Sequence, residues 1–281
     1  MKLRGLLLGA AVALTMAPPA LAERASDGNV SIIYWQAPSI LNPYLSSGTK
    51  DIESSSLVIE PLGRYTETGA MVPYLAKEIP TVANGGVSSD LKSITWKLKD
   101  GIMWSDGSPV TSADVKFTAD YCMNSDMGCA QLAKFDHVTS IDTPDSATVV
   151  VSFAQPMPNP YGPFMGGQSP IIQMAQFENC TGAKAQSCTE QNFGPIGTGP
   201  FVVTEFRPND VIQMKANDNY RDPSKPAFAT LTFKGGGDAM GAGRSVLETG
   251  EFDYAWNLQL APDVIAKTEE GGKGVAIAGF G

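Results

Sequence analysis

The clearest alternation of apolar and polar positions is ITWKL at residues 94–98. A period of two residues is typical of a half-buried strand. Asp100-Gly101 follows, and because glycine accepts a positive φ angle, this pair between two apolar runs indicates a tight turn. We therefore predict a hairpin in which residues 102–104 return as the partner strand of 94–98.

A helix is predicted directly after this hairpin. Thr111 stands three residues before Asp114, so its hydroxyl can accept from the first-turn amides while the carboxylate lies near the positive end of the helix. The helix should run from Ser112 to about Met123, with Val115 and Ala119 on one face. No residue of this stretch has an evident chemical role, and we interpret it as scaffold.

The same patterns predict further elements along the chain, which together indicate an α/β fold. The expected strands are 29–35, 138–141 paired with 148–153, 201–206 paired with 211–216, 230–234, 251–256 and 275–278. The expected helices are 50–60, 171–177, 241–249 and 262–269.

Residues 1–22 have the pattern of a cleaved signal peptide. A basic start at Lys2 and Arg4 precedes an apolar core, and Ala20-Leu21-Ala22 is a small-residue cleavage site before Glu23. No cysteine follows that site, so a lipid anchor is not expected. The sequence therefore predicts an exported, periplasmic protein.

Net charge limits the partners. The whole chain carries a net charge of -9, and cleavage would remove two positive and no negative charges, leaving -11. Nucleic acids and anionic membranes attract clusters of lysine and arginine, which are missing here. We expect no nucleic-acid partner.

Four cysteines in an exported chain indicate two disulfides. Three pairings are possible, and Cys122 with Cys129 and Cys180 with Cys188 are favoured because they close short local loops. A site of four metal-binding thiols is the rival interpretation. It lacks a CxxC pair, and the single histidine, His137, lies far from both pairs in sequence.

Tests for catalytic motifs fail. The glycine-rich run GGGDAMGAGR at 235–244 lacks the Gly-Lys-Ser/Thr ending of a phosphate-binding loop, and GGQSPI has Pro170 where a nucleophile elbow needs glycine. A single histidine excludes most Ser-His, Cys-His and zinc-hydrolase schemes. We expect no catalytic residue, no metal site and no cofactor, and favour recognition by aromatic walls.

Three segments carry a family resemblance. They are ITWKLKDGIMWSDGSPVTSADV, GPIGTGPFVVTEFRPNDVIQMKANDNYRD and SVLETGEFDYAWN. The chain resembles the extracytoplasmic solute-binding proteins of peptide-type ABC importers, the oligopeptide, dipeptide and nickel-binding family 5. Phe201 stands where that family usually has tyrosine. YWQAPSILNPY and EPLGRYTETGAMVPYLAKEI fit the family's opening in the same order, so the resemblance covers nearly all of residues 30–260.

The resemblance implies a periplasmic-binding-protein-like clamp of two α/β lobes, with a smaller extra subdomain on the first lobe. By that pattern, 23–45 and 190–281 belong to lobe one and 46–189 to the extra subdomain. The second lobe is expected after the last residue, because no terminal amphipathic element closes the sequence. We thus expect only the first lobe and its extra subdomain in this chain.

The resemblance also implies a ligand site at the ends of two strands of lobe one. The positions carried over are Gln36, Ala37, Pro38, Ser39, Trp256, Asn257 and Gln259. By strand alternation, Trp35 and Tyr254 could point into the core instead. For Trp256, ligand contact and core packing both stay open.

The predicted function is capture of a peptide or similar small solute and its delivery to an inner-membrane ABC permease, by a monomer. The rivals are a secreted hydrolase and a structural or chaperone-like envelope protein. The sequence leaves the ligand open among peptide, oligosaccharide, opine and metal chelate.

Overall fold

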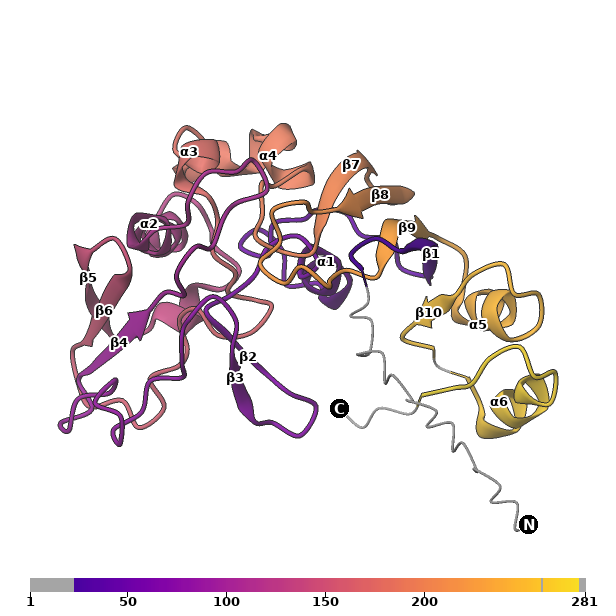
Figure 1. The fold of residues 1–281 in the computed structure, drawn as a ribbon, viewed down its shortest axis with the longest axis horizontal. Helices are drawn as coiled ribbons and strands as arrows, with labels where there is room; N and C mark the ends of the chain where they lie inside the picture. Colours follow the sequence, from indigo (N-terminus) through magenta and orange to yellow (C-terminus); the bar gives the residue numbers. More distant parts are fainter. Residues whose placement is uncertain (1–22, 259, 278–281) are drawn as a thin grey trace, which may run out of the picture.

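The two larger β-sheets belong to different parts of the chain, and helix α1 lies between them (Figure 1). The computed structural model describes residues 23–258 and 260–277, so the predicted signal peptide lies outside the described residues. One sheet has five strands in the order β10-β1-β9-β8-β7, and the other has three in the order β4-β6-β5.

The five-stranded sheet joins the first strand of the chain to its last ones. Its strands are β1 (Asp27–Tyr34), β7 (Phe201–Arg207), β8 (Val211–Ala216), β9 (Phe228–Gly235) and β10 (Tyr254–Trp256). β1 runs parallel to both β9 and β10, and β8 runs antiparallel to β7 and β9. The carboxyl ends of β1, β9 and β10 therefore meet at one edge.

The second sheet belongs to a separate layer with its own helices. It contains β4 (Ser93–Lys97), β5 (Val138–Asp145) and β6 (Thr148–Phe153), beside a short hairpin of β2 (Gly63–Tyr65) and β3 (Met71–Pro73). Its helical elements are α2 (Ser112–Met123), α3 (Met174–Phe177), α4 (Thr189–Phe193) and the 3-10 turns Leu132–Phe135 and Gly182–Ser187. α1 (Thr49–Ser55), α5 (Ala239–Leu247) and α6 (Pro262–Glu269) complete the fold.

Two hydrophobic cores follow the two sheets. The larger one gathers around Trp96, Trp104 and Tyr121, and the smaller one lies against the five-stranded sheet around Tyr34 and Phe233. Burial of these apolar surfaces is the main favourable term for each unit. Val58 and Ile59, just after α1, pack into the smaller core. The domain division expected at residue 45 stays a prediction.

Several predicted elements are confirmed. α2 begins at Ser112 and ends at Met123, and the Thr111 backbone N–H donates to Asp114 Oδ2 at 2.9 Å. The pairings of β5 with β6 and of β7 with β8 are present, and α6 has the predicted bounds. Both predicted disulfides, Cys122–Cys129 and Cys180–Cys188, are formed.

The hairpin predicted at Asp100-Gly101 is wrong. β4 pairs antiparallel with β6, where Trp96 lies opposite Val149. Residues 102–104 instead fold back at the second Asp-Gly turn, where the backbone N–H of Trp104 donates to Ser108 O at 2.8 Å. The β-branched strand β6 offers β4 a longer ladder than three residues can, so the nonlocal pairing wins.

Other elements are shorter than predicted or not formed. The helix expected at 171–177 begins only at Met174, and the strand expected at 251–256 only at Tyr254. The helix expected at 50–60 ends at Ser55, because the carbonyls of Leu57 and Val58 accept the backbone N–H groups of Phe201 and Gly199 instead of continuing a helix. The strand expected at 275–278 is not formed over 275–277, where the Ala276 N–H donates to the Glu269 carboxylate at 2.5 Å. Residue 278 lies outside the described residues.

Candidate ligand-binding site

The carboxyl edge of β1 and β10 opens into a cavity of about 1060 Å³, here called the sheet-edge cavity. Its wall is formed by Gln36 after β1, by residues 48–50 and Glu53 of α1, by 253–258 around β10, and by parts of α5, α6 and 275–277. Ligands in open α/β sheets gather outside the carboxyl ends of strands, at this kind of edge. The cavity is large enough for a small-molecule or peptide ligand.

Three of the predicted ligand-binding residues line the sheet-edge cavity. They are Gln36, Trp256 and Asn257. Gln36 and Asn257 are exposed, whereas Trp256 is only 6% exposed. Gln259 lies outside the described residues. A ligand role for these residues stays a prediction.

The other three predicted residues, Ala37, Pro38 and Ser39, are not part of the cavity wall and are held within the protein. Ala37 packs against the backbone of Gly235. A Cβ added to Gly235 would lie 2.0 Å from the Ala37 Cβ, so only glycine permits this close approach. The carbonyl of Pro38 accepts the backbone N–H of Asn209 at 2.9 Å. This part of the loop after β1 is therefore packed against the turn between β7 and β8.

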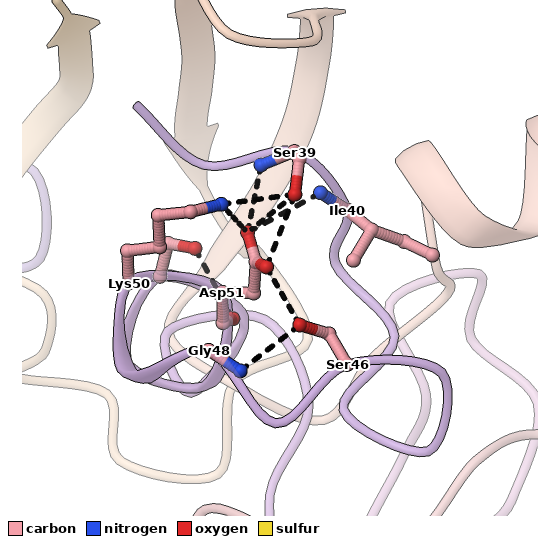
Figure 2. Close-up of polar contacts among 7 residues, drawn as sticks. Ser39, Ile40, Ser46, Gly48, Lys50 and Asp51 are labelled. Atoms are coloured by element: carbon pink, nitrogen blue, oxygen red, sulfur yellow. Dashed lines mark hydrogen bonds and ion pairs between the residues drawn. The ribbon is translucent and has the colours of Figure 1, made fainter. Parts of the chain in front are cut away.

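Ser39 belongs to a polar network around Asp51 (Figure 2). Asp51 Oδ1 accepts the Ser39 backbone N–H at 2.7 Å and Lys50 Nζ at 2.9 Å, and Oδ2 accepts the Ser46 hydroxyl at 2.7 Å. Burial alone would raise the Asp51 pKa, but these donors outweigh it and hold the pKa below its ordinary value. An ionised Asp51 thus fixes the loop after β1 to the start of α1.

Trp256 is both core and cavity wall. Its ring stacks on Tyr34 with centroids 4.7 Å apart and planes 15° apart, while its indole N–H donates to the Glu53 carboxylate of α1. Burial and the nearby Glu53 charge raise the pKa of Tyr34. Core packing of Trp256 is therefore observed, and because the same ring borders the cavity, ligand contact stays a prediction.

The two neighbouring aromatic residues, Tyr254 and Trp35, differ in exposure and in contacts. Tyr254 is 46% exposed and borders the cavity, and burial together with the Glu53 charge raises its pKa. Trp35 is half-buried, and its indole N–H donates to the carbonyl of Asn257 at 3.1 Å. Asn257 has a φ of 52°, a left-handed conformation that asparagine tolerates better than most residues. Trp35 thus joins the loops that follow β1 and β10.

Sequence reasoning missed the contribution of α1. Lys50 and Glu53 border the cavity, although the sequence assigned their segment to the extra subdomain. The sequence pattern of α1 indicated apolar residues but did not indicate which of the two hydrophobic cores they pack into. Only the packing of Val58 and Ile59 on the five-stranded sheet brings this helix beside β10.

The described residues contain no group of three or more His, Cys, Asp or Glu side chains arranged to hold a metal ion. Across 23–258 and 260–277, the helices are also too short or too polar to cross a membrane.

The family model of bacterial extracellular solute-binding proteins, family 5 Middle, matches residues 70–279, about three quarters of the chain. The chain belongs to this family. A Brucella ovis relative described as an ABC transporter peptide-binding protein is 27% identical over 172 residues, which are 60% of this chain and 31% of the relative. Protein XP55 of Streptomyces lividans is 29% identical over 196 residues, 69% of this chain and 33% of that protein.

Two solved structures of binding proteins share the fold. The substrate-binding protein CtaP of Listeria monocytogenes matches with a TM-score of 0.73 at 24% identity, over 88% of this chain and 47% of CtaP. The oligopeptide-binding protein AppA of Bacillus subtilis, in complex with a nonapeptide, matches with a TM-score of 0.72 at 22% identity, over 82% of this chain and 44% of AppA.

The fold is thus the α/β fold of two-lobed peptide-binding proteins, over about half of their length. The chain spans about a third of the length of the curated relatives it matches. These family 5 relatives are solute-binding proteins rather than enzymes.

Proposed function

We propose that this chain is the ligand-binding part of an ABC importer, which captures a peptide or a similar small solute outside the cytoplasm. The observation that carries the proposal is the sheet-edge cavity, walled by Trp256, Tyr254 and polar loop residues, in a chain of family 5. Aromatic walls with a few convergent polar groups are typical of small-molecule sites. AppA, which shares the fold, binds a nonapeptide.

The proposal includes the location and partners predicted from the sequence. The protein works in the periplasm after cleavage before Glu23, as a monomer, and passes its ligand to an inner-membrane permease. It binds without chemical turnover. The signal-peptide pattern of residues 1–22 and the names of the family 5 relatives support this role.

Capture would occur by closure of the two lobes around the ligand. A ligand shifts the equilibrium between the open and the closed state only as far as its affinities for the two states differ. The residues proposed to contact it from lobe one are Gln36, Trp256 and Asn257, together with Gln259, two positions further along the sequence. Ala37, Pro38 and Ser39 would act by holding Gln36 in place.

Thermal unfolding of the full-length protein with candidate ligands tests the proposal. Ligands that bind only the native state stabilise it by about 2.7 kcal/mol at one hundred times Kd, so the midpoint should rise. The panel contains peptides, oligosaccharides, opines and nickel chelates. A panel without any shift would overturn the proposal and favour a structural envelope role, and ligand breakdown during binding would favour the hydrolase alternative.

A further inference from the structure

The ionisable side chains of the sheet-edge cavity are mostly acidic. Its wall contains Lys50, Glu53, Asp253 and Glu269. Lys50 is already paired, because its Nζ lies 2.9 Å from the carboxylate of the buried Asp51, which does not border the cavity. The cavity wall therefore presents three carboxylates and a lysine whose charge is balanced elsewhere.

The three carboxylates differ in what already binds them. Asp253 accepts the backbone N–H and hydroxyl of Ser31 at 2.7 and 2.8 Å, and these bonds hold its pKa below the ordinary value. Glu269 accepts the backbone N–H of Ala276 at 2.5 Å. Both carboxylates therefore already accept backbone N–H groups and stabilise the fold locally.

Glu53 stands apart because aromatic side chains surround it. Its carboxylate accepts the indole N–H of Trp256, and its charge helps to raise the pKa of both Tyr34 and Tyr254. No lysine, arginine or histidine forms an ion pair with Glu53 within 23–258 and 260–277. The Trp256 indole N–H orients this carboxylate without neutralising its charge.

A carboxylate beside the exposed ring of Tyr254 suits one class of ligand group. Cations are attracted to the face of a tyrosine ring by its quadrupole, and to carboxylates by their charge. A neutral ligand group at this place would leave the Glu53 charge without a counter-charge as the cavity loses water, and an anionic group would be repelled by it. An ammonium or guanidinium group is attracted by both the ring and the carboxylate.

Resting on the proposed function, we propose that the sheet-edge cavity selects ligands with a positively charged amine or guanidinium group, and that Glu53 is the residue that determines this specificity. The site is the cavity already described, and the inference concerns the charge it accepts. Trp256 acts as a positioning residue, because its indole N–H holds the carboxylate beside the sheet.

The test compares matched pentapeptides binding to full-length protein by calorimetry. Each peptide is pentaalanine with one substitution, to Lys, Met or Glu, scanned over all positions. Lys and Met have similar length and differ mainly in charge. At the best position, the Lys peptide should bind about tenfold more tightly than the Met peptide, and the Glu peptide more weakly than both.

Variants of the protein assign this preference to Glu53. Glu53→Gln keeps the shape and should bring the Lys to Met ratio to within about twofold. Glu53→Asp keeps the charge and should retain part of the preference. Glu251→Gln removes the same charge from an exposed position outside the cavity wall and should leave the ratio unchanged.

The possible outcomes separate the two proposals. Equal binding of Lys and Met peptides to the native protein, or an unchanged ratio in Glu53→Gln, would overturn the charge selection while leaving peptide binding intact. Absence of binding to every peptide would overturn peptide capture, and with it this inference. If Glu53→Gln does not fold, the native ratio should still fall as sodium chloride rises from about 20 to 500 mM, and a constant ratio would contradict the proposal.

Discussion

The three-stranded-sheet unit and the carboxyl edge of the five-stranded sheet use the same residue types in opposite ways. Trp96 and Trp104 are 0% and 1% exposed, in a unit that also contains both disulfides. At the edge, Tyr254 is 46% exposed, and the Trp256 indole N–H is directed to a carboxylate. Aromatic residues stabilise the first region, whereas in the second they border a cavity with charged groups.

This difference shows how the protein separates stability from recognition. A well-packed core with cross-links tolerates no change of volume, but it leaves nearby surfaces free to vary. An edge with exposed aromatic and acidic groups contributes less to stability and more to contacts with a ligand. Substitutions in the two regions should therefore affect different measurements.

The largest effect is expected from Trp96→Ala. Removal of this buried ring leaves a cavity in the larger core and should lower the free energy of unfolding by about 3–5 kcal/mol. Urea unfolding followed by intrinsic fluorescence gives the loss, and ligand affinity of the folded fraction should stay unchanged. Trp96→Phe is the control. It keeps a ring and removes an indole N–H that has no partner in the described part of the chain, so it should cost less.

Removal of one disulfide comes next. The double variant Cys122→Ala/Cys129→Ala should lose about 2–3 kcal/mol, because a short closed loop no longer restricts the unfolded chain. The Cys180 and Cys188 pair should give a similar loss, since the two bridges span 8 and 7 residues in sequence. Chemical denaturation measures both. A change in ligand affinity without loss of stability would contradict the claim that this unit affects stability rather than ligand binding.

Asp51, which fixes the loop after β1 to α1, should make the free energy of unfolding depend on pH. Its pKa in the folded protein lies below the ordinary 3.8, so its contribution is complete above that value and is lost as the pH falls through the lower folded pKa. Asp51→Asn should cost about 1–2 kcal/mol at neutral pH and flatten the acid dependence of unfolding. Asp218→Asn removes the same charge from an exposed side chain and is the control, which should change the acid dependence less. An acid profile unchanged by Asp51→Asn would refute this role.

The smallest effect is expected from Trp256→Phe. The ring can still stack on Tyr34, but the hydrogen bond to Glu53 is lost. Affinity for a peptide found by thermal shift should fall roughly fivefold, about 1 kcal/mol, with less change in stability. Calorimetry and thermal unfolding of the same samples measure both. A fall in stability alone would make Trp256 a core residue and remove it from the site.

Local patterns predicted the elements whose contacts are close in sequence. The capped helix at 112–123, the hairpin of β7 and β8 and both disulfides follow from short-range spacing, because each needs only neighbouring residues to form. The pairing of β4 with β6 instead joins residues about fifty positions apart, and the turn pattern at 100–101 could not reveal it.

The candidate site shows the same limit more strongly. The family resemblance directed attention to Gln36 and Trp256, and both border the cavity. Lys50 and Glu53 had no motif, because ordinary charged residues of a short helix resemble any solvent-exposed face. The resemblance also named Ser39, whose backbone N–H and hydroxyl both donate to Asp51, a contact that no motif indicated.

The sequence by itself determined the family, the α/β class, the covalent cross-links and several local elements, because these depend on composition, spacing and near neighbours. Only the tertiary structure decided that β1 lies between β9 and β10, and that Glu53 of α1 meets Trp256 of β10. Those two residues are 203 positions apart. A contact of that kind depends on the packing of Val58, Ile59 and Trp256 into one core, which no short-range pattern encodes.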